Sequence, residues 1–166
     1  MKSWIYSAIL PLFAILPATR FFGVKRALLR CAGADIAAEV KLVSSVRVYL
    51  GGKLTIGKGS WIGHQTLIVG GKSDVTIGEE VDIAPRVLMA TGHHEIATSG
   101  RKAAGPGYSL PVKIGDGCWI GANATILGGS TIGDASIVAA NAMVKGDFPA
   151  KSLIGGCPAR VIRSLA

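Results

Sequence analysis

Aliphatic residues recur at every sixth position over the C-terminal half of the chain, and small residues accompany them. The aliphatic positions are Ile114, Ile120, Ile126, Ile132, Val138 and Val144. Most are followed by glycine or alanine, and the fourth position after each of the first five is also small: Cys118, Ala124, Ser130, Ser136 and Ala142. Neither the helical period of 3.6 nor the strand period of 2 produces this spacing, so the pattern is a hexapeptide repeat.

The same register extends upstream in three shorter blocks. These are Ile36/Leu42/Val48, Ile56/Ile62/Ile68 and Ile77/Ile83/Met89. Three hexads make one triangular coil, so the chain predicts a parallel β-helix of about five coils. Six residues at a rise of roughly 3.3 Å build a wall of about 20 Å, narrow enough for one aliphatic side chain per wall to fill the interior.

Residues 1–33 differ from the repeats and form a separate N-terminal segment before a β-helix domain over 34–166. The apolar run from Trp4 to Leu16 is interrupted by Pro11 and closed by Pro17, so it is too short and too broken to span a bilayer as one helix. The stretch 20–30 mixes apolar and basic residues and predicts a basic amphipathic helix. Two interpretations stay open and are compatible: a helical cap on the open end of the solenoid, and a surface that contacts an anionic membrane.

The hexad register stops between Met89 and Ile114. The intervening residues are rich in glycine, proline, serine and charge, which predicts an extended loop at about 90–112. A loop inserted into a regular scaffold is a common location for function. After Val144 the pattern ends, and the last residues predict a short basic helix that closes the other end.

Charge and cysteine content narrow the possible partners. The chain has 18 basic and 10 acidic residues, a net charge of +8, which favours an anionic partner. Nucleic acid is the least favoured, because aromatic residues make up only 6% and basic residues are scattered except near the ends. The isolated Cys31, Cys118 and Cys157 predict reduced, mostly buried thiols in a cytoplasmic protein.

The candidate chemistry lies in the loop, which contains His93 and His94, two of the three histidines. No Ser/His/Asp or Cys/His spacing suggests covalent catalysis, and the histidine spacing of a trimeric β-helix carbonic anhydrase is missing. The sequence therefore predicts no metal site.

Three segments resemble the hexapeptide-repeat acyltransferases, and most closely the branch of galactoside, maltose, Nod-factor, colanic-acid and O-antigen O-acetyltransferases. The segments are T-G-H-H-E in the loop, I-G-D-G-C-W-I-G-A-N-A at 114–124 and G-G-C-P-A-R-V-I-R at 155–163. The resemblance covers roughly residues 34–165. It implies a left-handed β-helix, acetyl-CoA as the acyl donor, and a homotrimer with three active sites, each between neighbouring subunits.

The resemblance implies that a loop histidine is the general base that takes the proton from an acceptor hydroxyl. Relatives with T-G-S-H-D, and a count of eleven residues from the inward Ile83, favour His94. Relatives with T-G-H-P favour His93. Register is the physical constraint, so His94 is preferred, with Glu95 as the residue that orients or polarises it.

The resemblance also implies a donor slot along the outer corner of the C-terminal coils. It would be formed by Trp119, Gly121, Ala122 and Ala140, with Lys145 nearby and Arg160 and Arg163 close to the nucleotide phosphates. Small residues let a pantetheine arm lie close to the backbone, and arginine suits phosphate geometry. Ala122 and Ala140 are 18 positions apart, which is one coil, so they are expected to stack.

Two departures from the galactoside enzymes indicate a different acceptor. Gly63 stands where those enzymes have a sugar-binding asparagine, and residues 1–33 replace their longer N-terminal region. We therefore expect an O-acetyltransferase acting on a carbohydrate hydroxyl, with a lipid-linked or nucleotide-linked sugar of surface-polysaccharide or O-antigen synthesis as acceptor. The alternatives are an enzyme of this fold acting on an amino sugar, serine or an antibiotic, and a non-catalytic β-helix scaffold. The expected location is cytoplasmic, with peripheral contact to the inner face of the membrane as an added possibility.

Overall fold

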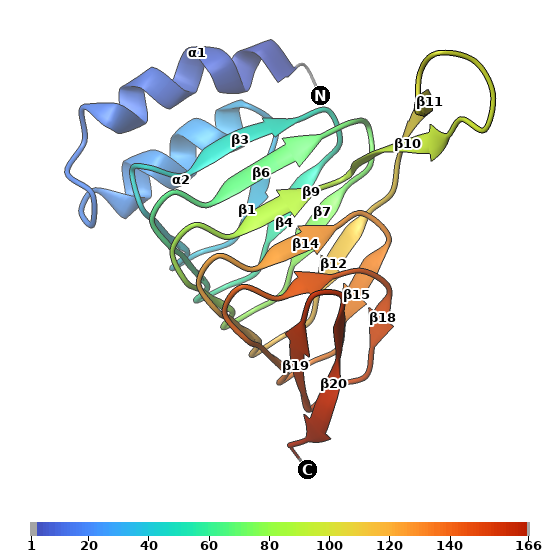
Figure 1. The fold of residues 1–166 in the computed structure, drawn as a ribbon. Coiled ribbons are helices and arrows are strands. Elements are labelled where there is room, and N and C mark those ends of the chain that lie inside the picture. Colours follow the sequence, from blue (N-terminus) through green and yellow to red (C-terminus); the bar gives the residue numbers. More distant parts are fainter. Residues whose placement is uncertain (1–2, 166) are drawn as a thin grey trace.

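The hexads fold into a three-sided parallel β-helix (Figure 1) in a computed structural model that describes residues 3–165, with side chains from residue 5 onward. Sheet A contains β1 (Asp35–Ile36), β4 (Leu54–Ile56), β7 (Val75–Ile77), β12 (Val112–Ile114), β15 (Ser130–Ile132) and β18 (Asp147–Phe148). Sheet B contains β2 (Lys41–Leu42), β5 (Trp61–Ile62), β8 (Asp82–Ile83), β13 (Trp119–Ile120), β16 (Ile137–Val138), β19 (Ser152–Gly156) and β20 (Ala159–Ser164). Sheet C contains β3 (Arg47–Leu50), β6 (Leu67–Gly70), β9 (Leu88–Ala90), β14 (Thr125–Leu127) and β17 (Met143–Val144). The predicted left-handed parallel β-helix is confirmed.

The repeated aliphatic residue of each hexad points into the solenoid. Ile62, Ile83, Ile120 and Val138 are each fully buried and lie directly above one another in sheet B, where their backbones pair in register. The inward side chains of each coil thus pack on those of the next coil. Burial of one such side chain stabilises the fold by about 1.5–3 kcal/mol. The register that the sequence predicts is therefore the register of the core.

The solenoid has about six coils, one more than predicted. Sheets A and B each have a strand from residues 147–156, beyond the last hexad that the sequence analysis counted. That segment was not counted because its aliphatic spacing is irregular, although Phe148 and Ile154 are buried like the earlier core residues.

The predicted N-terminal helical segment consists of α1 (Ser3–Ala14) and α2 (Phe22–Cys31), which cover the first coil (Figure 1). Arg30 Nε donates to the carbonyl of Ile36 at 2.7 Å, and Arg26 Nη1 donates to the carbonyl of Val40 at 3.0 Å. Both carbonyls belong to the first coil, which has no preceding coil to bind them. The basic residues of α2 thus donate hydrogen bonds to carbonyls at the open end of the sheets, which is the role of a cap.

The structure gives no support to the membrane interpretation of this segment, since the cations invoked for lipid contact include Arg26 and Arg30, which bind backbone carbonyls of the chain itself. Within residues 3–165, none of the helices combines the length and the apolar character needed to cross a bilayer.

Lys25 of α2 is fully buried and joins the two helices. Its Nζ donates to the carbonyls of Pro17 at 3.0 Å and Ala18 at 2.7 Å, and it lies 5.3 Å from the centre of the Phe22 ring. Burial lowers the pKa of this ammonium group. Lys25 therefore fixes the connection between α1 and α2.

Lys25→Ala is expected to lower the free energy of unfolding by about 1–3 kcal/mol, because it removes two hydrogen bonds and leaves a cavity where the fully buried lysine side chain was packed. Urea unfolding followed by circular dichroism measures this change, with Arg20→Ala as the matched control at an exposed basic position of the same segment. Equal urea midpoints for the two variants would show that Lys25 does not hold the cap.

The predicted C-terminal helix is wrong. Residues Ala159–Ser164 form strand β20, which pairs antiparallel with β19. The physical reason is that β19 would otherwise be the unpaired edge of sheet B, and Val161 and Ile162 favour a strand.

Two of the three cysteines also differ from expectation, because Cys31 and Cys157 are exposed and only Cys118 is buried.

Candidate active site

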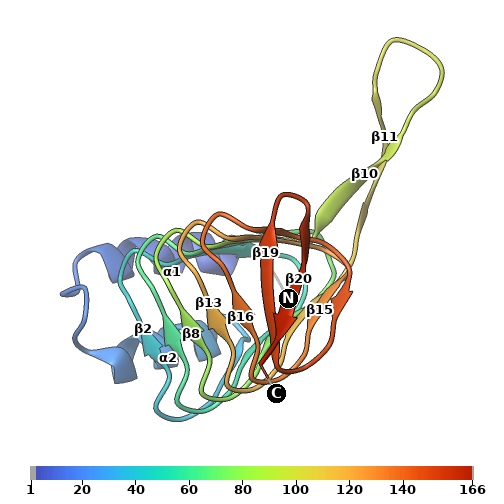
Figure 2. The same ribbon diagram turned by 60° about the horizontal axis from the view of Figure 1, so that its bottom comes forward.

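The predicted extended loop is a hairpin that projects from the solenoid (Figure 2). It is formed by β10 (Gly92–Ile96) and β11 (Ala104–Ser109), which pair antiparallel. The hairpin leaves the corner that follows sheet C, here called the hairpin corner, where Lys72, Gly128 and Lys145 of other coils also lie. Ser109 anchors it, because its Oγ lies 2.9 Å from Ser73 Oγ and accepts the Ser73 backbone N–H at 3.2 Å.

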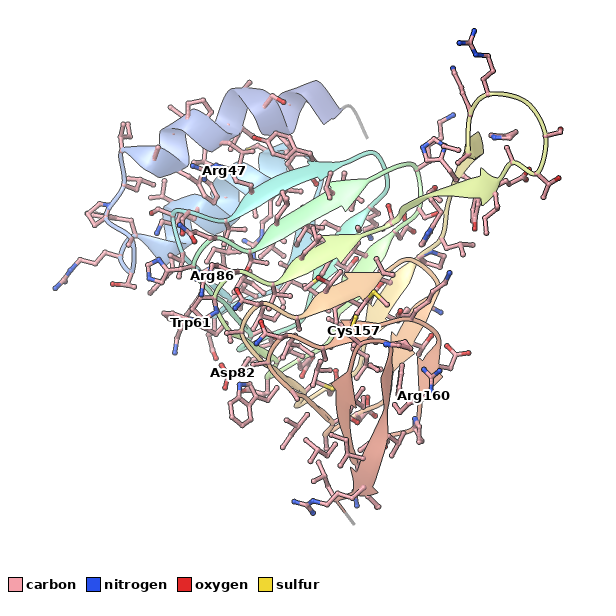
Figure 3. The ribbon with its side chains drawn as sticks, viewed as in Figure 1. Arg47, Trp61, Asp82, Arg86, Cys157 and Arg160 are labelled. Atoms are coloured by element: carbon pink, nitrogen blue, oxygen red, sulfur yellow. The ribbon has the colours of Figure 1, made fainter. Side chains whose placement is uncertain are left out.

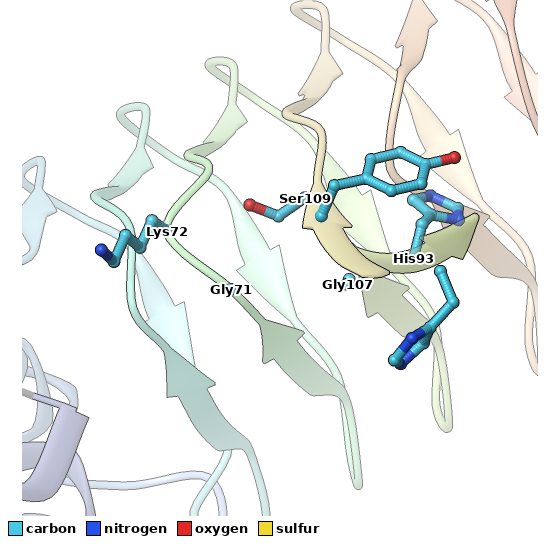
Figure 4. Close-up of a pocket in the computed structure, with 8 residues that line it drawn as sticks. Gly71, Lys72, His93, Gly107 and Ser109 are labelled. Carbon is cyan, nitrogen blue, oxygen red and sulfur yellow. The ribbon is translucent and has the colours of Figure 1, made fainter. Parts of the chain in front are cut away.

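An open depression of about 700 Å³ lies at the base of the hairpin. Figure 4 shows Lys72 on the preceding coil, at the opposite side of the depression from His93 and the strand that carries Gly107 and Ser109, with its side chain directed away from them. The lining residues are Gly71, Lys72, Gly92, His93, His94, Gly107, Tyr108 and Ser109. Both candidate histidines thus border the same depression.

His93 is held between the hairpin and the solenoid. Its Nε2 lies 3.1 Å from the carbonyl of Gly128 in the next coil, and its ring stacks on Tyr108 with centroids 5.5 Å apart. A carbonyl only accepts, so Nε2 is the protonated nitrogen and Nδ1 is free to take a proton. The half-buried ring therefore has a fixed orientation and a basic nitrogen.

His94 lies on the opposite face of β10, because side chains alternate along a strand. Its Nδ1 lies 2.9 Å from the carbonyl of Gly105, a residue of the hairpin itself, and its side chain is exposed. Glu95 is also exposed, and the Gly105 carbonyl rather than Glu95 is the partner of His94. His94 therefore has a defined tautomer, and its hydrogen bond ties it to the hairpin rather than to the solenoid.

Gly128 sets the approach of His93 to the solenoid. A Cβ at this position would lie 2.8 Å from the carbonyl oxygens of Thr91 and Leu110 and 2.9 Å from His93 Nε2. These distances are shorter than a methyl group tolerates, so only glycine lets the imidazole reach this carbonyl.

Gly128→Ala is expected to reduce turnover by at least about tenfold, because a displaced imidazole loses its alignment. Gly107→Ala is the matched control, since its Cβ would lie 3.5 Å from the His94 ring in ordinary contact. Comparison of kcat for the two variants tests the assignment, and a larger loss in the Gly107 variant would favour His94 as the functional residue.

Most of the predicted donor-slot residues gather on another part of the solenoid. Ala122 and Ala140 lie one above the other at the corner between sheets B and C, here called the alanine corner, and the Asn141 N–H donates to the Ala122 carbonyl at 2.9 Å. Trp119 is 54% exposed on the outer face of sheet B. Gly121 has no room for a Cβ, which would lie 2.6 Å from the Ala140 nitrogen. Small residues and one exposed indole form this surface, which suits a flexible chain lying along the backbone.

The remaining predicted residues divide between two places. Arg160 and Arg163 are exposed on β20 at the end of sheet B, paired opposite Gly155 and Leu153. Lys145 follows β17 and lies at the hairpin corner, apart from the slot that it was expected to join.

The histidines and the donor-slot residues do not meet within one chain. The two corners lie at opposite edges of sheet C, a wall roughly 20 Å wide at the usual strand rise. In Figure 3, Trp61, Asp82 and Arg86 lie on the side of the molecule away from the hairpin, and Arg86 belongs to the alanine corner of the third coil. The two groups of predicted residues therefore lie apart within one chain.

Lys72, Tyr108 and Gly128 border the candidate site and were not identified from the sequence. The irregular hexad spacing at Gly70–Asp74 was the available signal for Lys72, since this segment contacts the hairpin through Ser73 and Ser109. No pattern in the sequence indicated that Tyr108 would stack on His93, because this contact depends on the pairing of β10 with β11.

Comparison with known proteins gives consistent matches. The family profile described as "Bacterial transferase hexapeptide (six repeats)" matches residues 111–146. Galactoside O-acetyltransferase of Escherichia coli is 39% identical over 119 residues, which are 69% of this chain and 56% of that protein. A putative colanic acid biosynthesis acetyltransferase of the same organism is 32% identical over 136 residues, 82% of this chain and 72% of the relative.

Among solved structures, a hexapeptide-repeat acetyltransferase of Vibrio cholerae in complex with acetyl coenzyme A has a TM-score of 0.73 at 27% sequence identity. The match covers 99% of this chain and 87% of that one. The chain spans little more than half the length of the galactoside enzyme that it matches.

Proposed function

The chain belongs to the hexapeptide-repeat acetyltransferase family, and we propose that it transfers an acetyl group from acetyl-CoA to a hydroxyl of a carbohydrate. The observation that carries this proposal is the His93 imidazole, oriented by a backbone carbonyl at the edge of an open depression. The relatives add support, since one is a galactoside O-acetyltransferase and a similar structure contains acetyl coenzyme A.

His93 is the proposed general base, in preference to His94. With its Nε2 proton directed to the Gly128 carbonyl, Nδ1 accepts the proton of the acceptor hydroxyl. The hydroxyl oxygen attacks the thioester carbonyl, forming a tetrahedral intermediate that collapses to the acetyl ester and releases the CoA thiolate. The imidazolium then returns its proton to the thiolate, so the base is regenerated.

Assembly into a trimer would complete the site. The outer face of sheet C bears two rows of partly exposed, mostly apolar side chains: Leu67, Leu88, Thr125 and Met143 in one, and Val69, Ala90 and Leu127 in the other. A face that is apolar apart from one threonine favours association, and the proposed occupants are two further copies of the chain. Around a threefold axis facing sheet C, the hairpin corner of one chain meets the alanine corner of the next. His93 of one subunit would then face the donor slot of its neighbour.

A hydroxyl acceptor is favoured over an amine because the depression contains no carboxylate. Its lining residues include Lys72 and two histidines but neither aspartate nor glutamate, so nothing there would attract an ammonium group. The finer proposal is a sugar of surface-polysaccharide synthesis, in line with the colanic acid relative.

The proposal is tested by following free thiol release from acetyl-CoA with a panel of sugars and sugar phosphates, together with acetyl-CoA binding by calorimetry. Acceptor-dependent thiol release supports it. Absence of acetyl-CoA binding would replace it with a scaffold role.

A further inference from the structure

A second depression, of about 390 Å³, lies at the N-terminal end of the alanine corner, between the segment after α1 and the first two coils. Its lining residues are Ala14, Leu16, Ala18, Ser44, Ser45, Arg47 and His64. Two of these side chains can bear a positive charge and none bears a negative one. The depression therefore suits an anionic group.

Arg47 is held in place by the backbone. Its Nη1 donates to the carbonyls of Ser44 and Val46, both at 3.0 Å, and the side chain is half-buried. These bonds occupy one nitrogen of the guanidinium, and no carboxylate among residues 5–165 forms an ion pair with it. A guanidinium that is fixed in this way and keeps further N–H donors can bind phosphate with little loss of side-chain entropy.

Ser45 and His64 extend the polar side of the depression. Ser45 Oγ accepts the backbone N–H of Gln65 at 2.9 Å and lies 3.4 Å from His64 Nδ1. The serine hydroxyl can donate to Nδ1, which leaves Nε2–H of His64 as a further donor.

The depression and the proposed donor slot lie on opposite sides of His93 along the solenoid axis. Ser45 belongs to the first coil and His64 to the second, whereas the hairpin with His93 leaves the third, and Ala122 and Ala140 belong to the fourth and fifth. Strands of adjacent coils are about 4.8 Å apart, so the depression begins roughly 5–10 Å from the level of the base. In the proposed trimer, acetyl-CoA would approach His93 from the C-terminal coils and the acceptor from the N-terminal coils.

We propose that Arg47 and His64 bind the phosphate of a phosphorylated sugar acceptor, and that this phosphate determines which hydroxyl reaches the base of the neighbouring subunit. This inference rests on the proposed acetyltransferase function. Lys72 of the neighbouring subunit belongs to the second coil, so it would add positive charge at the same height. The phosphate belongs either to a nucleotide-linked or to a lipid-linked sugar, and these sources share the chemistry that the site recognises.

The test is calorimetric titration of the full-length protein, saturated with CoA so that the donor slot is occupied. The probes are glucose 1-phosphate, UDP-glucose, a ten-carbon prenyl diphosphoglucose and neutral methyl glucoside. At least one phosphorylated probe is expected to bind about tenfold more tightly than methyl glucoside, and Arg47→Gln to weaken that probe about tenfold or more, as loss of a charge-assisted bond predicts. The probe that binds best identifies the nucleotide or the lipid as the source.

Arg86→Gln is the matched control. Arg86 lies one coil after Gln65, the neighbour of His64, at the same corner; it does not line the depression, and its φ of 63° is close to the 57° of Gln65. Arg86→Gln removes the same charge from the same region as Arg47→Gln, and it is expected to leave binding of the phosphorylated probe unchanged. Equal losses in both variants, or phosphorylated probes that bind no better than methyl glucoside, would overturn the proposal. CoA binding in the same samples separates this failure from failure of the acetyltransferase function.

Discussion

Replacing His93 with alanine is expected to lower kcat/KM for acetyl transfer by about 10²–10⁴-fold, the usual contribution of a positioned general base. His94→Ala is expected to lower it by less than about tenfold, since the His94 ring is exposed and its hydrogen bond goes to the hairpin. The measurement is free thiol release from acetyl-CoA in the presence of an active acceptor. The loss should appear in kcat, because the proposed donor slot lies at the other corner and acetyl-CoA binding does not depend on His93.

His93→Asn and His94→Asn serve as conservative controls, because asparagine keeps a polar group of similar reach without a basic nitrogen. Their circular dichroism spectra must match the wild type for the rates to be compared. A large loss in the His94 variants with little loss in the His93 variants would reverse the assignment and restore the preference given by register alone.

The sequence predicted the solenoid well because its period and its core are the same feature. Each hexad supplies one inward aliphatic side chain, so Ile120 and Val138, 18 positions apart, could be placed in adjacent coils before their pairing was known. Stacking of Ala122 on Ala140 followed from the same arithmetic. Sequence and structure agree wherever a contact joins equivalent positions of neighbouring coils.

The remaining contacts depend on segments outside the repeat. The pairing of β10 with β11 places Tyr108 on His93, and no periodicity encodes that register. Residues 159–164 mix basic and apolar residues in a way that suits a helix as well as a strand, and the free edge of β19 decides between them. The register argument for His94 assumed that coil geometry continues into the hairpin, whereas the chain leaves the solenoid at that point.

Two inactive variants are expected to restore activity when mixed, if each active site combines residues of two subunits. His93→Ala removes the base from the hairpin corner, and Ala140→Trp places a bulky side chain in the proposed donor slot at the exposed alanine corner. In trimers assembled at random from equal amounts of both, a site is intact when one subunit supplies His93 and its neighbour supplies Ala140. Each condition holds in half of the cases, so about one quarter of the wild-type activity should return.

The mixture is unfolded and refolded together, and sedimentation velocity establishes that the products are trimers. Separately refolded variants mixed afterwards are the control and should stay inactive as long as subunits do not exchange. Restoration to about a quarter, only after joint refolding, places the base and the donor slot on different chains. A monomer by sedimentation, or trimers without restored activity, would instead require that one chain carry a complete site, which the separation of the two corners across sheet C makes difficult to achieve.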